Sequence, residues 1–227
     1  MSLFQLNSRH EGLFGPLALF ILITGVAFVF SMPSATYVRE IAQTTLTRGT
    51  PLAFFAVYAL AFTLLGLNQG ASVVSKLGWG RSVFPITLGN LATALVMTTP
   101  YLVYTRIILL PLDRSAILSV AGYSFLAAIS FALMGQWLEV RAVRLGRESL
   151  IPRYGTAAAV IAIPMAFHFA PEGVRLLSLI SPLSAALQLH AGATPIQTLF
   201  LFLLPVVGSI AMLLLTRRER GISRVRV

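Results

Sequence analysis

Long uncharged runs are the feature that most constrains what this chain can fold into. Six stretches contain no Asp, Glu, Lys or Arg, and they are Leu13–Val38, Gly49–Ser75, Ser82–Thr105, Ser115–Leu138, Tyr154–Pro171 and Leu176–Thr216. A helix needs about 20 apolar residues to cross roughly 30 Å of hydrocarbon, and each run approaches or exceeds that length. The chain has 227 residues, so the runs leave little of it for a water-soluble domain. We therefore expect an integral membrane protein.

The fold class follows from the composition of these runs and from their continuous apolar character. Hydrophobic residues make up 57% of the chain and charged residues 11%, far from the soluble averages of roughly 45–50% and 25%. The runs are continuously apolar, as lipid-exposed helices require, whereas the strands of a membrane barrel alternate in character. We expect an all-α integral membrane protein forming a single transmembrane domain over residues 1–227.

Six transmembrane helices fit the runs. We place them at 13–32, 52–74, 83–108, 115–138, 155–171 and 195–216. The segment Leu176–Leu189 is too short to cross alone, since it would reach only about 21 Å as a helix. The segment up to the last span is interrupted by Pro182, His190, Gly192 and Pro195. We expect short re-entrant or interfacial helices there, on the outer side of the membrane.

The basic residues set the orientation. If both termini share one side, twelve basic residues lie on that side, namely Arg9, Lys76, Arg81, Arg141, Arg144, Arg147, Arg153, Arg217, Arg218, Arg220, Arg224 and Arg226. The other side carries five, namely Arg39, Arg48, Arg106, Arg114 and Arg175. The excess of positive charge predicts that both termini are cytoplasmic. These juxtamembrane positions suit anionic lipid headgroups, and no basic face is interleaved with aromatics, so we expect no nucleic-acid partner.

Motifs of catalysis are missing from the sequence. There is no cysteine, no His-Glu-x-x-His zinc motif and no Gly-rich phosphate loop, so we expect no catalytic residue, no cofactor and no metal in this chain, which is then not an enzyme. No acidic residue lies deep within the runs, which argues against a proton relay. Ser124 and His168 would make a rhomboid-like pair, but Phe125 stands where that motif has glycine. We interpret His168 instead as a polar contact between helices or toward the outer interface.

A few polar and small residues stand out inside the runs. Asn68, Gln69, Asn90 and Gln136 lie near the cytoplasmic ends of their spans, and together with His168 they either line a substrate path or join helices through hydrogen bonds. Two pairs of small residues, Gly66 with Gly70 and Ala128 with Ala132, favour close helix packing. The spacing alone does not say whether that packing lies within one chain or between two.

Trp79 lies in a tight basic connection between the second and third spans. It stands between Gly78 and Gly80, and Lys76 and Arg81 flank it. One interpretation is a tryptophan anchored among the lipid headgroups. The other is an aromatic knob on a short cytoplasmic helix that docks into a partner.

This layout resembles the permease subunit of an exporter-type ABC transporter of the second export family. The shared features are about six spans with both ends cytoplasmic, a cytoplasmic helix between spans two and three, and a following stretch similar to Gly80–Leu91. The end of the chain matches best, where Ser181–Leu187 is similar to the family's outer hairpin and the last span runs into Arg217–Arg220. The family's Glu-rich stretch has no counterpart, because 68–75 carries no acid.

The resemblance implies a function. The chain would be the transmembrane subunit of an exporter in a bacterial or archaeal plasma membrane, paired with a second permease copy in a homodimer or heterodimer. ATP and Mg would be held by a separate ATP-binding subunit, coupled through Lys76, Leu77, Trp79 and Arg81. The alternative from another class is a non-transporting scaffold or assembly subunit of a larger membrane complex, which the scarcity of buried ionisable groups fits equally well.

Overall fold

The computed structural model describes residues 36–75, 79–106, 114–145, 150–169, 178 and 180–223. Every regular element within these ranges is a helix. In chain order the elements are α2 (Thr36–Ser75), α3 (Trp79–Tyr104), α4 (Arg114–Arg144), α5 (Leu150–Ala166), the 3-10 helix η2 (Phe167–Phe169), α6 (Pro182–His190) and α7 (Pro195–Ser223). The expected all-α class is confirmed over this part of the chain.

Four of the described helices are long and apolar enough to cross a membrane. Their apolar windows are Pro51–Gly70, Ile86–Val103, Arg114–Val143 and Pro195–Glu219. They correspond to the expected spans at 52–74, 83–108, 115–138 and 195–216. The expected span at 13–32 lies outside the described residues.

The expected span at 155–171 is a shorter element. Its apolar part is Ala158–Phe169, and α5 is 17 residues long, or about 25 Å at 1.5 Å per residue. Pro164 lies inside the helix, and the chain tightens into η2 from Phe167. Proline removes a backbone donor and crowds the preceding turn, so Pro164 weakens the helical hydrogen bonding in the last turns of α5.

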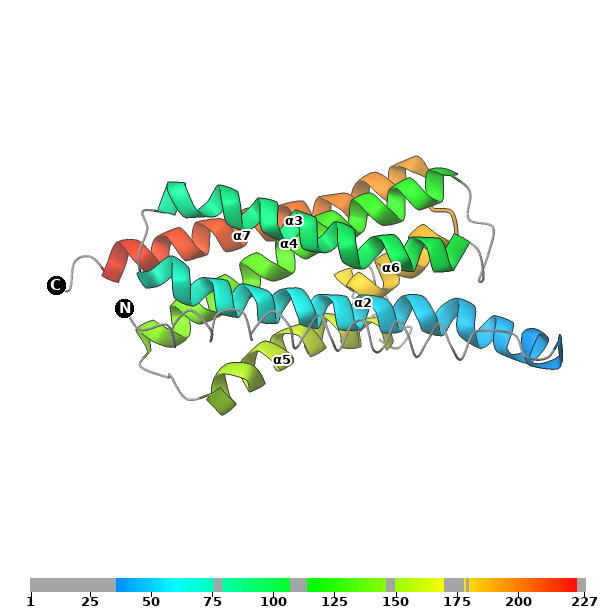
Figure 1. The fold of residues 1–227 in the computed structure, drawn as a ribbon, viewed down its shortest axis with the longest axis horizontal. Coiled ribbons are helices and arrows are strands. Elements are labelled where there is room, and N and C mark those ends of the chain that lie inside the picture. Colours follow the sequence, from blue (N-terminus) through cyan, green and yellow to red (C-terminus); the bar gives the residue numbers. More distant parts are fainter. Residues whose placement is uncertain are drawn as a thin grey trace.

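Successive long helices run in alternating directions along one bundle (Figure 1). The C-terminal ends of α2, α4 and α7 therefore lie at the same end as the beginning of α3. That end carries the exposed arginines Arg141, Arg217 and Arg218, and the opposite end carries Arg106 and Arg114. We keep the prediction that the arginine-rich end is cytoplasmic, and call the two ends the inner and outer ends on that basis.

The centre of the bundle is the contact between α2 and α4, the most extensively packed pair. A Cβ at Gly66 would overlap the carbonyl oxygen of Ala132, and one at Gly135 would overlap that of Thr63. A Cβ at Gly70 would lie 2.5 Å from the Cβ of Glu139. Small residues thus let the two backbones touch. The motifs at Gly66 and Gly70 and at Ala132 pack within one chain, which answers the question that spacing left open.

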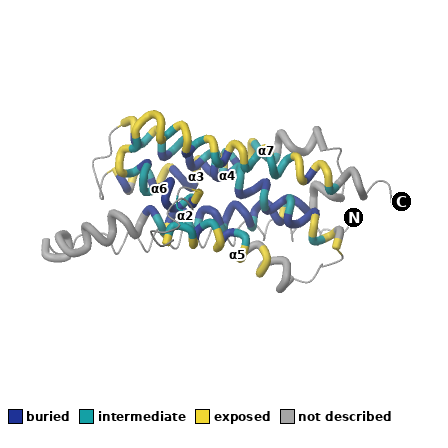
Figure 2. The backbone as a smooth tube through the Cα atoms, turned by 180° about the vertical axis from the view of Figure 1, so that it is seen from behind, coloured by how far each residue is buried: buried dark blue, intermediate teal, exposed yellow. Residues whose placement is uncertain are grey.

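Burial falls from the centre of the bundle to its flank. Of the apolar window of α2, 61% is buried inside the chain, against 11% of the window of α7 (Figure 2). α7 packs mainly on α4, where Phe202 meets Gly122 and Gly208 meets Ser130. Most of the α7 surface is therefore left for lipid or for another protein.

Aromatic side chains fill the outer half of the core. Phe54 stacks on Tyr101 with ring centroids 3.7 Å apart and planes 7° from parallel. The buried hydroxyl of Tyr58 donates to the carbonyl oxygen of Ser124 at 3.0 Å and accepts from Thr98 at 3.3 Å. These bonds tie α2 to both α3 and α4 and leave the phenol oxygen satisfied in an apolar core.

The helix α6 is short, as expected for the segment before the last span. It begins after Ser181 with Pro182 in its first turn, and its buried side packs on α2 and α4. Gly192 follows it with φ of 83°, a conformation that glycine adopts without strain. Thr194 and Gln197 then form a reciprocal capping box, with bonds of 3.0 and 3.4 Å, that starts α7 at Pro195. The position of α6 relative to the membrane stays a prediction.

Candidate functional site

Three of the amide side chains singled out in the sequence meet at one point in the inner half of the bundle. Gln69 on α2 donates from Nε2 to Oδ1 of Asn90 on α3 at 2.6 Å. Asn90 Nδ2 and Gln136 Nε2 both donate to Oε1 of Gln69, at 3.2 and 3.1 Å. Asn90 is 3% exposed and Gln136 6%. We call Gln69, Asn90 and Gln136 the amide cluster.

The amide cluster joins the three central helices. Each amide would be costly in an apolar interior without a partner, and here each has one. Hydrogen bonds of this kind between membrane helices contribute about 0.6–2 kcal/mol each. The cluster therefore couples α2, α3 and α4 mechanically near their inner ends. Asn68, the fourth amide of the prediction, lies on an exposed face of α2, because neighbouring residues on a helix point about 100° apart.

Glu139 is the polar residue that the sequence pattern did not single out. It lies three residues after Gln136 on α4, packs against Gly70, and is 3% exposed. It comes directly after the uncharged run Ser115–Leu138, and we expected no acidic residue at depth. It is buried because the small residue Gly70 on α2 draws α4 close enough to cover it. The helical spacing Gln136-x-x-Glu139, matched to Gly66-x-x-x-Gly70, is the signal that would have found it.

The flank of α4 next to Glu139 carries an aromatic and a cationic residue. The guanidinium of Arg141 lies 5.3 Å from the centre of the Trp137 ring, a cation–π distance. Trp137 also packs against Leu67 and Leu138, while Arg141 is exposed. This contact marks the level at which α4 passes from the apolar core to the charged inner end.

The predicted coupling residues lie around the connection from α2 to α3. Lys76 and Leu77 are outside the described residues. Trp79 is the first residue of α3 and Arg81 lies in its first turn, and their side chains are also outside the described part. α2 runs beyond its apolar window Pro51–Gly70 to Ser75, and α3 begins at Trp79, so the expected extension of this helix into the cytoplasm stays a prediction. Continuous helical hydrogen bonding carries α2 past its polar stretch.

Ser124 and His168, the two residues of the rhomboid-like alternative, each have another partner. The Ser124 hydroxyl donates to the carbonyl oxygen of Val120 at 2.7 Å. His168 in η2 lies 2.9 Å through Nδ1 from Oγ of Ser184 on α6. This position matches the interpretation of His168 as a contact between helices, and a substrate path past His168 stays a prediction.

A second histidine contact fastens the end of α6. Nδ1 of His190 lies 2.6 Å from the carbonyl oxygen of Ala186, which can only accept, so Nδ1 carries the proton. Nε2 is then free to accept from the hydroxyl of Tyr101, 2.6 Å away. His190 thereby links α6 to α3. Burial lowers the pKa of His190, against a smaller opposite effect of the hydrogen bond to Ala186, so the imidazole is neutral near pH 7.

Among the described residues, no group of three or more His, Asp or Glu side chains gathers as a metal site. Comparisons of the chain with models of protein families, with curated proteins and with solved structures find no match.

Proposed function

We propose that this chain is the transmembrane subunit of an ABC exporter, driven by a separate ATP-binding subunit that holds ATP and Mg. The observation that carries the proposal is the amide cluster, which joins α2, α3 and α4 close to the α2–α3 connection. A push on that connection from a soluble partner would reach the inner ends of three helices together. An exporter needs such a transmission element, because its ATPase sits outside the membrane.

The distances along the helices favour this coupling. Gln69 precedes Ser75, the last residue of α2, by six residues, or about 9 Å at 1.5 Å per residue. Movement of the connection acts on α2 and α3 directly, and the bond from Gln136 brings α4 along. The extensive packing of α4 on α7 would extend the movement to the flank of the bundle.

A second permease copy completes the proposal. The apolar faces of α3 and α7 are largely exposed, with Val96, Leu203 and Val207 among the exposed residues. Surfaces of this kind face lipid or another membrane helix. In the proposed exporter one of them contacts the second copy, and the substrate moves between the two copies.

A scaffold subunit of a larger membrane complex is the second candidate. It is favoured by the way the amides are arranged, because Gln69, Asn90 and Gln136 bond to one another. Amides that hydrogen-bond to one another can stabilise helix packing at least as well as they can line a substrate path. In this alternative the cluster rigidifies the bundle and no ATPase is bound.

Affinity purification of the full chain from its own membranes separates the two candidates. The exporter predicts a stoichiometric ATP-binding subunit whose ATP hydrolysis falls when the amide cluster is broken by Gln69→Leu, while Asn68→Leu on the exposed face leaves it unchanged. Recovery of a complex without an ATP-binding subunit would contradict the exporter and support the scaffold.

A further inference from the structure

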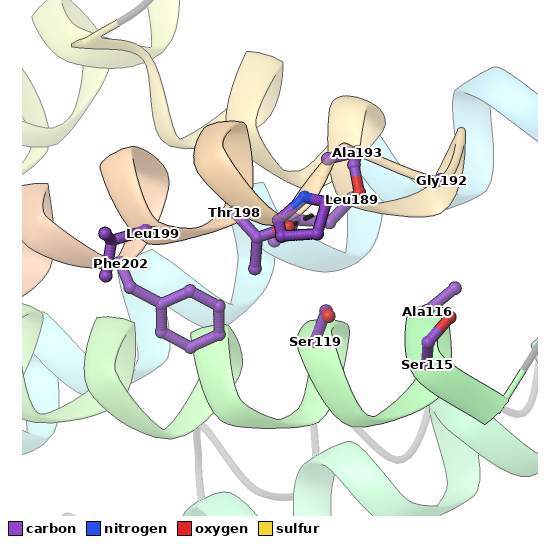
Figure 3. A pocket seen from close by; sticks show the side chains of 10 residues that line it. Ser115, Ala116, Ser119, Leu189, Gly192, Ala193, Thr198, Leu199 and Phe202 are labelled. Carbon is purple, nitrogen blue, oxygen red and sulfur yellow. Dashed lines mark hydrogen bonds between the residues drawn. The ribbon is translucent and has the colours of Figure 1, made fainter.

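A cavity lies at the outer end of the bundle, away from the amide cluster. It measures about 500 Å³, is open on one side, and is lined by the start of α4, the end of α6 and the start of α7 (Figure 3). That volume is within the range of small-molecule binding sites, about 300–1,000 Å³. The site described above does not use this cavity.

The lining of the cavity is apolar in depth and hydroxylated along one wall. Ala116 and Leu189 are buried in its wall. Ser115 and Ser119 stand one turn apart on α4, on the side that faces the turn between α6 and α7 (Figure 3). Across from them the Thr198 hydroxyl lies 3.5 Å from the carbonyl oxygen of Ala193, to which it donates. The cavity is therefore amphipathic.

Phe202 closes the inner end of the cavity. Its ring lies 3.0 Å from where a Cβ of Gly122 would stand, and it meets Tyr123 edge to face with centroids 6.3 Å apart. The ring thus forms a floor about two helical turns below Pro195. Because Gly122 has no side chain, the ring of Phe202 can lie close to α4 there.

The mouth of the cavity adjoins the surface of the bundle that faces lipid. Next to lining residues in the sequence, Leu118 on α4 is 73% exposed and Ile196 on α7 is 82% exposed. Exposed apolar side chains on membrane-crossing helices contact hydrocarbon. Hydrocarbon beside such a surface can enter the apolar part of the cavity, where water would lack enough polar partners.

A basic residue stands one position before the hydroxylated wall of the cavity. Arg114 is the first residue of α4, immediately before Ser115, and its side chain is exposed. A cation and hydroxyls at the outer end, with apolar depth below, match the order of groups in a phospholipid from headgroup to acyl chain.

We propose that the cavity between α4, α6 and α7 binds one acyl chain of a bilayer phospholipid, with an anionic headgroup beside Ser115 and Arg114. The upper part of the acyl chain lies against Leu189, above the ring of Phe202. The glycerol and phosphate oxygens accept hydrogen bonds at the hydroxylated wall. A bound lipid would join α4, α6 and α7 at the outer end, where α6 is short.

Titration of the purified full chain with phosphatidylglycerol, followed by native mass spectrometry, tests this proposal. Ser119→Phe and Ala193→Leu each fill the cavity from a different wall. Each should raise the dissociation constant of the lipid about tenfold or more, since displacing two buried methylene groups has that effect. The matched control is Thr99→Phe, which adds a ring to the exposed face of α3 and should leave binding unchanged.

Further ligands separate the acyl chain from the headgroup. Phosphatidylcholine should bind more weakly than phosphatidylglycerol, and Arg114→Gln should remove that difference. Glycerophosphate, which has no acyl chain, should not compete. Wild-type affinity in both filled variants would overturn the proposal, and so would competition by glycerophosphate equal to that of the whole lipid. Because Ala193 lies in the turn outside the helices, Ala193→Leu tests the cavity even if Ser119→Phe disturbs α4.

Discussion

Gly66 of α2 lies directly against the backbone carbonyl of Ala132 on α4, with no room between them for a side chain. The contact stands at the middle of the most extensively packed helix pair in the bundle. It brings the two helices close enough for Gln69 to reach Gln136 and for Gly70 to cover Glu139. The approach of two small residues therefore positions the polar site of the inner half.

Gly66→Ala should destabilise the protein by about 1–3 kcal/mol, because the added methyl group can be accommodated only by moving the backbone of α4. Gly89→Ala is the matched control, since the space around Gly89 in α3 is open. It should be neutral or stabilising by up to about 1 kcal/mol, through the better helix propensity of alanine. Thermal melting of both variants in the same detergent measures the difference. Equal melting temperatures would show that α4 accommodates the added methyl group without loss of stability.

Gln69→Leu should cost about 1–3 kcal/mol, because it strands the buried amides of Asn90 and Gln136. Asn68→Leu, one residue away on the exposed face, should cost little. Replacing both partners in Gln69→Leu/Asn90→Leu should recover part of the loss, since fewer polar groups are then left without a bond. A double variant as unstable as the sum of the two single variants would contradict this coupling.

The contact of His190 with Tyr101 predicts a loss of stability in mild acid. Burial lowers the pKa of His190 from its ordinary value of 6.5, so between pH 6.5 and the lower folded value the unfolded chain binds more protons. The stabilisation is then complete above about pH 6.5 and declines as the pH falls through that window. Thermal melting from pH 8 to pH 5 should show a steeper decline for wild type than for His190→Gln. Parallel curves would mean that His190 does not contribute.

Trp79→Ala should release the ATP-binding subunit of the proposed exporter while the permease stays folded. Aromatic anchors at interfaces commonly contribute about 2 kcal/mol or more. Lys76→Ala should do little, since exposed ion pairs contribute about 0–1 kcal/mol. Pull-down of the ATP-binding subunit with each variant, beside a melting curve, measures both effects. Equal recovery with wild type and Trp79→Ala would leave Trp79 as a headgroup anchor.

Cysteine labelling tests the orientation. With the inner end cytoplasmic, single cysteines in place of Ser2, Arg147 and Ser223 should resist an impermeant thiol reagent in intact cells. One in place of Thr45, near the opposite end of α2, should react. The chain has no cysteine of its own, so each label reports a single position. Labelling of Arg147→Cys from outside would reverse the assignment of the two ends.

The long helices could be read from the sequence alone. In hydrocarbon every backbone N–H and C=O must be bonded within its own segment, so a long uncharged run becomes a helix almost regardless of its neighbours. The helices expected at 52–74 and 195–216 are confirmed as long and apolar enough to cross a membrane, over the windows Pro51–Gly70 and Pro195–Glu219. The short α6 was equally visible, because Pro182 and Gly192 bound a segment too short to cross.

Only the tertiary structure decided which residues meet. The spacing of Gly66 and Gly70 indicated close packing but not its partner, because Ala132 is 66 residues further along the chain. The same long-range contact buries Glu139, which local sequence places at an interface, and it brings Gln69 to Asn90 and Gln136. Local hydrogen bonding determines where a membrane helix forms, whereas side-chain packing between distant segments determines what its polar residues bind.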